Sequence, residues 1–122
     1  MKLTNLQIYN YAVALTTHFQ SEEQRFPIKA NFYLLKNKNT LMGLAQEIEQ
    51  ERSKILQDNG VLNEETQQYE ISAEKVNSVN QELNDLFSLT QDVHIYTTSL
   101  ESFGDAALTT AQMEAIMFMI ED

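Results

Sequence analysis

The chain has 122 residues, 43% of them apolar, with 3 glycines, 1 proline and no cysteine. This composition excludes a disordered, a collagen-like and a disulfide-stapled protein. A chain of this length buries roughly two-thirds of its unfolded surface, so a single domain over residues 1–122 needs no metal ion or disulfide for stability.

The net charge of −10 is concentrated in the second half of the chain. Residues 1–61 carry seven basic and six acidic side chains, whereas residues 62–122 carry one lysine and twelve acidic side chains. We expect such a molecule to avoid nucleic acid and anionic membranes and to associate fastest with basic surfaces. A merely solvated acidic surface explains the same excess.

The N-terminus lacks the apolar stretch and the small-residue cleavage site of a signal peptide. The longest apolar run, residues 115–120, is far shorter than the roughly 20 residues that cross a bilayer. We therefore expect a cytoplasmic protein without a membrane partner.

The first half of the chain predicts two helices. Thr4 is a suitable N-cap for a helix over 5–20, whose apolar residues recur at helical spacing. A polar link at 21–25 leads to Pro27, which suits the first turn of a helix over 28–59. At 1.5 Å per residue that helix is roughly 45–50 Å long, so part of it should project or pack against another chain. Gly60 is expected in the left-handed conformation that ends helices.

The second half predicts a smaller helix between two short strands. Residues 69–71 and 93–97 show strand-like patterns, and these strands could pair across a helix that Ser72 caps and that runs from about Val76 to Phe87. Residues 99–104 are expected to form a turn or a single helical turn.

A terminal helix is predicted after Thr109, which forms a capping-box pattern with Gln112. Its expected buried stripe consists of Met113, Ile116, Met117 and Ile120. Phe118 and Met119 lie off this stripe and are expected to remain free for a partner. The fold class predicted from all these elements is mainly α (α+β), a helical domain with one long helix and a small two-stranded β element.

No motif for catalysis, phosphate binding or metal binding is recognisable in the sequence. The three glycines are isolated, and neither histidine belongs to a metal-binding pattern. We expect His18 to end the first helix and His94 to lie on a strand. The sequence therefore predicts a protein that is not an enzyme and needs no cofactor.

Four segments resemble a family of small proteins encoded by tailed phages and prophages of Gram-positive bacteria. The segments are KLTNLQIYNY at 2–11, KANFYLLKNK at 29–38, ELNDLF at 82–87 and LTTAQMEAIM at 108–117. The resemblance implies a phage origin, and so a location in the host cell cytoplasm or in the virion. It implies no active site.

Two functions compete under that origin. The first is a non-enzymatic accessory protein that binds a phage structural protein during virion assembly or is itself a minor component of the virion. The second is an inhibitor of a host nucleic-acid-handling or defence protein, whose acidic side chains imitate a phosphate backbone. A DNA-binding regulator is disfavoured because basic residues are few.

Both functions require a protein-binding surface, and a homodimer is possible. The candidate protein-binding residues are eight acidic residues and four apolar residues: Glu64, Glu65, Glu70, Glu82, Asp85, Asp92, Glu101, Asp105, Met113, Met117, Phe118 and Met119.

Overall fold

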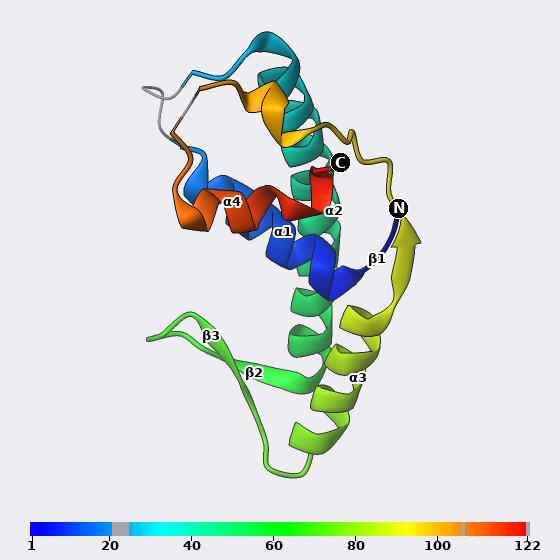
Figure 1. The fold of residues 1–122 in the computed structure, drawn as a ribbon. Helices are drawn as coiled ribbons and strands as arrows, with labels where there is room; N and C mark the ends of the chain where they lie inside the picture. The colour runs from blue at the N-terminus through cyan, green and yellow to red at the C-terminus, as the bar shows by residue number, and fades with distance from the viewer. Residues whose placement is uncertain (21–24, 106, 122) are drawn as a thin grey trace.

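The computed structural model describes residues 1–20, 25–105 and 107–121 and shows the predicted mainly α (α+β) fold. The helices are α1 (Asn5–His18), α2 (Ile28–Asn59), α3 (Val76–Ser88) and α4 (Thr110–Ile116), with two short 3-10 helices, η1 (Leu100–Phe103) and η2 (Met117–Met119). Two antiparallel two-stranded sheets complete the described part of the chain (Figure 1). Most of the predicted polar link, residues 21–24, lies outside the described residues.

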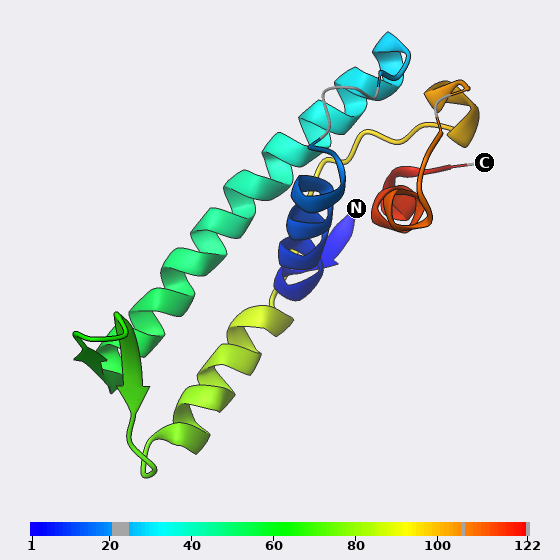
Figure 2. The same cartoon turned by 90° about the vertical axis from the view of Figure 1, so that its left-hand side faces the viewer.

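Helix α2 runs along the whole length of the molecule and has the predicted bounds (Figure 2). Pro27 is the N-cap of this helix rather than a residue of its first turn. Gly60 is extended, with a φ of −126°, so the predicted left-handed conformation is wrong. The reason for glycine here is space, because a Cβ atom would come within 2.8 Å of the Leu56 carbonyl oxygen.

Helix α1 begins as predicted but ends at His18, two residues early. The Thr4 hydroxyl accepts a hydrogen bond from the Gln7 backbone N–H at 3.1 Å, and the Gln7 side chain accepts one from the Thr4 backbone N–H at 2.9 Å. This reciprocal pair is the capping box. An equivalent box at Thr109 and Gln112 opens α4, as predicted.

The strand pairing differs from the prediction. Strand β1 (Lys2–Thr4) pairs with β4 (Thr90–Asp92), and β2 (Gly60–Asn63) pairs with β3 (Gln68–Ile71). The second pair is a local hairpin whose turn is held by the Asn63 side chain, which accepts hydrogen bonds from the N–H groups of Glu65 and Thr66. Residues 68–71 therefore pair with β2, the strand directly before them in the chain, and the predicted pairing with 93–97 is wrong.

The predicted strand over 93–97 is also wrong. The β1–β4 pairing continues only to Val93, whose N–H donates to the Met1 carbonyl oxygen. Residues 94–97 belong to no strand. The backbone N–H and carbonyl oxygen of Tyr96 bond instead to the Asn37 side chain of α2. Ser72 is no helix cap either, because α3 follows Lys75, and only the carbonyl group of Ser72 bonds to the start of that helix.

The core lies around α1, the first half of α2 and the C-terminal segment. Its largest fully buried side chains include Ile8, Leu15, Leu41, Phe103 and Ile116. Beyond Ile48 the next buried residue along the chain is Val79. The molecule therefore has a well-packed body and a thinner extension, formed by the end of α2, the hairpin and α3 (Figure 2). Within the described ranges, no helix is both long and apolar enough to span a bilayer.

Candidate protein-binding surfaces

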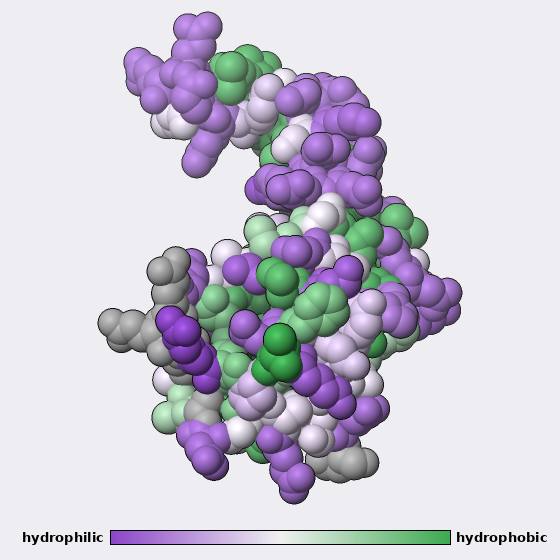
Figure 3. Space-filling model, turned by 90° about the horizontal axis from the view of Figure 1, so that it is seen from above, coloured by the Kyte–Doolittle hydropathy of each residue, from purple (hydrophilic) through white to green (hydrophobic). Residues whose placement is uncertain are grey.

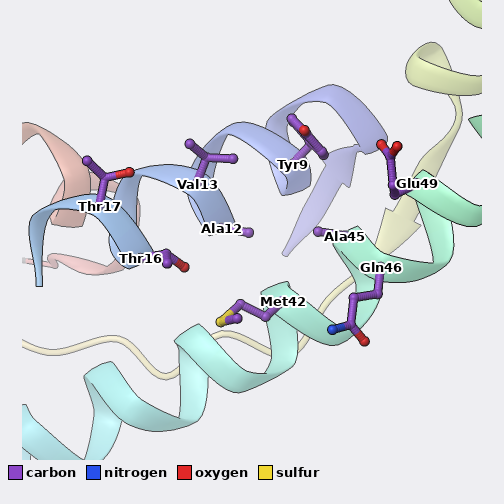
Figure 4. A pocket seen from close by; sticks show the side chains of 9 residues that line it. All are labelled: Tyr9, Ala12, Val13, Thr16, Thr17, Met42, Ala45, Gln46 and Glu49. Carbon is purple, nitrogen blue, oxygen red and sulfur yellow. The ribbon is translucent and has the colours of Figure 1, made fainter. Parts of the chain in front are cut away.

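An open groove of about 300 Å³ runs between α1 and α2 (Figure 4). Ala12 on α1 and Ala45 on α2 form its floor, and their small side chains leave room where the two helices pack together. Met42 extends along the floor from α2, and Val13, 48% exposed, stands at the rim on α1. The lining is almost entirely apolar, which suits an apolar side chain of a partner.

Polar groups mark the two ends of this groove. Thr16 and Thr17 lie at one end, and Glu49 lies at the other (Figure 4). The Glu49 carboxylate already pairs with the Arg52 guanidinium at 2.8 Å. The groove therefore offers an apolar contact surface rather than a pair of free catalytic groups.

The predicted acidic residues do not converge on one surface. Glu64, Glu65 and Glu70 lie on the hairpin at the C-terminal end of α2, whereas Glu101 and Asp105 lie on or beside η1 near its N-terminal end. These ends are about 48 Å apart for a helix of 32 residues. Glu82 and Asp85 lie on α3, and Asp92 ends β4.

Within the extension the charge is nevertheless concentrated. Residues 47–85, which we call the acidic arm, carry ten acidic and three basic side chains, a net charge of −7. Hydrophilic side chains dominate the narrow end of the molecule that carries the hairpin, with a few hydrophobic ones among them (Figure 3). Of the eight predicted acidic residues, five belong to this arm: Glu64, Glu65, Glu70, Glu82 and Asp85.

The predicted roles of the methionines are reversed. Met119 is completely buried, and Phe118 stacks on Tyr11 with ring centroids 4.5 Å apart, so neither is free for a partner. Met113 and Met117 are exposed instead, by 40% and 65%. The cause is the end of α4 at Ile116, after which the chain tightens into η2 and changes the direction of its side chains.

The outer face of α2, which points away from the core, is apolar in its first half. Ile28, Phe32 and Leu35 are exposed by 88%, 51% and 52%. The same face continues through Asn39 and Gly43, both also exposed. Residues 25–46 carry four basic side chains and no acidic one, and we call this segment the basic end.

Buried amide side chains, which no sequence pattern above predicts, join the segments of the core. The Asn37 side chain donates to the Tyr96 carbonyl oxygen at 2.9 Å and accepts from the Tyr96 N–H at 2.8 Å. Asn5 donates to the Leu86 carbonyl oxygen, and Gln112 donates to that of His18. One sequence signal could have indicated that Asn37 is buried. It lies three positions after Leu34 and four before Leu41, and so within the apolar stripe of this helix.

The described residues offer no cluster of three or more His, Cys, Asp or Glu side chains for a metal ion. His18 lies in the last turn of α1, as predicted. His94 lies outside the strands and packs edge-on to Tyr96, with ring centroids 4.8 Å apart. We compared the chain with protein-family models, curated proteins and solved structures, and none of them matches.

Proposed function

We propose that the chain is a non-enzymatic phage accessory protein that binds a phage structural protein, in virion assembly or as a minor component of the virion. The resemblance of the four segments supports the phage origin and, with it, a location in the host cell cytoplasm or in the virion. The observation that carries the binding role is the apolar groove between α1 and α2, with the half-exposed Val13 at its rim.

The shape of the groove favours a protein ligand. Its volume of about 300 Å³ is at the lower end of the range for cavities that enclose small molecules. The groove is open along its length, so an amphipathic segment can lay apolar side chains onto Ala12, Met42 and Ala45 while its polar face stays in water.

A matched pair of variants tests the groove. Val13→Glu places a carboxylate at the rim, and Leu6→Glu places one elsewhere on α1 at a side chain of equal exposure, 50% against 48%. In pull-downs from infected cells, Val13→Glu should reduce recovery of the phage structural partner by about tenfold or more, because burying an unpaired charge is unfavourable.

Leu6→Glu should leave that recovery unchanged. Equal recovery with both variants and the wild type would exclude the groove as the binding site. If the wild type recovers no phage structural protein at all, the assembly role itself is wrong.

The acidic arm favours a second candidate, the inhibitor of a host nucleic-acid-handling or defence protein. Its net charge of −7 matches a basic groove that ordinarily holds phosphates. Such a partner should be released between low and high salt because exposed charges are screened, whereas an apolar partner should stay bound. Recovery of a host protein that high salt removes would therefore replace the assembly role.

A further inference from the structure

The long helix carries two exposed surfaces of opposite charge, one at each end. The basic end presents Ile28, Phe32 and Leu35 beside Lys29 and Lys36. The acidic arm presents the exposed Val61 and Leu62 of β2 among its carboxylates. Both surfaces thus combine apolar side chains with charge, and the two charges are complementary.

These two surfaces cannot meet within one molecule. They lie at opposite ends of α2, a straight helix about 48 Å long (Figure 2). Pairing of like surfaces between molecules would bring Lys29 and Lys36 against lysines, or carboxylates against carboxylates, which is unfavourable. Contact between the basic end of one copy and the acidic arm of another satisfies both the charges and the apolar side chains.

Gly43 supplies an independent observation. It lies at the middle of α2 on the exposed outer face, and an added Cβ atom would meet nothing within 4 Å. Glycine inside a helix destabilises it relative to alanine, and no packing in this molecule requires glycine at this position. Its absent side chain allows close approach of a second helix.

We propose that two copies of this chain pair side by side and antiparallel through the outer faces of their α2 helices, with the two-fold axis beside Gly43. The basic end of each copy then lies against the acidic arm of the other. With the axis between residues 43 and 44, Lys36 lies opposite Glu51 of the second copy, and Lys29 lies opposite Asp58.

The apolar side chains agree with this register. Ile28 lies opposite Asn59, the last residue of α2, and so next to the β2 strand that exposes Val61. Because the arrangement has two-fold symmetry, each contact occurs twice. The Glu51 carboxylate pairs with Lys54 of its own helix at 3.2 Å, but its side chain is still 57% exposed. Asp58 is also exposed, so both carboxylates are accessible to lysines of the second copy.

A charge swap tests the pairing on purified protein. Sedimentation equilibrium should give twice the chain mass of 14.0 kDa for the wild type. Lys29→Glu/Lys36→Glu and Glu51→Lys/Asp58→Lys should each weaken self-association by about tenfold or more, because every contact becomes repulsive and occurs twice. An equimolar mixture of the two variants should recover the wild-type affinity, because each reversed surface then meets its complement.

Lys2→Glu/Asn10→Asp/Gln20→Glu is the matched control, since it changes the net charge by the same amount as the lysine variant, at exposed side chains outside α2 and the acidic arm. This variant should keep the wild-type mass, and circular dichroism should show equal helicity for all variants. A wild type that stays monomeric up to hundreds of micromolar, a control that dissociates equally, or a mixture that does not recover would each overturn the proposal.

Single cysteines test the direction, since the chain has none of its own. With a short bis-maleimide linker, Gly43→Cys should cross-link to itself, and Lys29→Cys should cross-link to Asp58→Cys but not to itself. In a parallel pair, Lys29→Cys would cross-link to itself and not to Asp58→Cys, and this result would overturn the antiparallel arrangement. This pairing is independent of the proposed phage role, because it is tested on purified protein without any partner. The charge-swap variants also leave the floor of the α1–α2 groove unchanged.

Discussion

Asn37 joins α2 to a segment of the chain that has no strand partner. Its side chain is completely buried and bonds to both the N–H and the carbonyl oxygen of Tyr96. It also donates to the Met119 sulfur at 3.5 Å, so a single amide connects three parts of the core. A buried amide that makes its hydrogen bonds specifies one arrangement of the chain, because any other leaves polar groups unpaired.

At the residue scale, we expect Asn37→Ala to lower the free energy of unfolding by about 2–4 kcal/mol, because it removes all three hydrogen bonds of this side chain and leaves a cavity. Asn39→Ala is the matched control on the same helix, where the side chain is exposed. It should change the stability by less than about 0.5 kcal/mol. Urea denaturation followed by circular dichroism measures both, and equal losses would contradict the anchoring role of Asn37.

Helix α1 contacts elements of both the body and the extension. It packs against α2, α3 and α4 and follows directly from β1. Its position depends on its first turn, where the Thr4 capping box coincides with the end of the β1–β4 pairing. The Asn5 N–H, which the helix itself cannot satisfy, donates to the Leu89 carbonyl oxygen at 2.8 Å.

At the element scale, we expect Thr4→Ala to destabilise the protein by about 1 kcal/mol through loss of the cap. Thr17→Ala removes the same side chain from an exposed position near the end of α1, where it makes no cap. It should be neutral or slightly stabilising, since alanine has the higher helix propensity. Thermal unfolding of the two variants compares them directly, and a larger loss for Thr17→Ala would refute the role of the cap.

The whole molecule divides into a packed body and a thin extension. The body contains the buried side chains of α1, of α2 up to Ile48 and of the C-terminal segment. Between residues 49 and 92 the only buried residue is Val79, and this interval includes the whole hairpin. Few buried apolar contacts mean a low free energy of local opening.

At the scale of the whole molecule, we expect amide hydrogen exchange to be fastest at the hairpin, residues 60–71, and slowest in α1 around Ile8 and Leu15. Hydrogen exchange with mass spectrometry should show this difference under native conditions. Residues 90–93 are a control of similar strand length, because their partner is β1 of the body, and they should exchange more slowly than the hairpin. Equal protection of both sheets would show that the molecule unfolds as one cooperative unit.

Local patterns in the sequence determined the helices of this protein. The bounds of α2, the N-cap at Thr4 and the capping box at Thr109 follow from residues close together in the chain, so they could be predicted, as could the mainly α (α+β) class. The acidic arm was visible only as an excess of charge. Its separation from Glu101 and Asp105 follows from the length of α2.

Tertiary structure alone decided the pairing of the strands, the burial of Met119 and the role of Asn37. The sequences of residues 68–71 and 90–92 do not specify which strand each pairs with. The observed partners, β2 and β1, depend on where the helices place these strands. Met119 turns inward because α4 ends at Ile116 and η2 follows. The Thr98 N–H donates to the Met119 carbonyl oxygen, and helical periodicity does not contain this contact across 21 positions. The groove beside Val13 likewise exists only where α1 and α2 pack together, so no single segment of the sequence could reveal it.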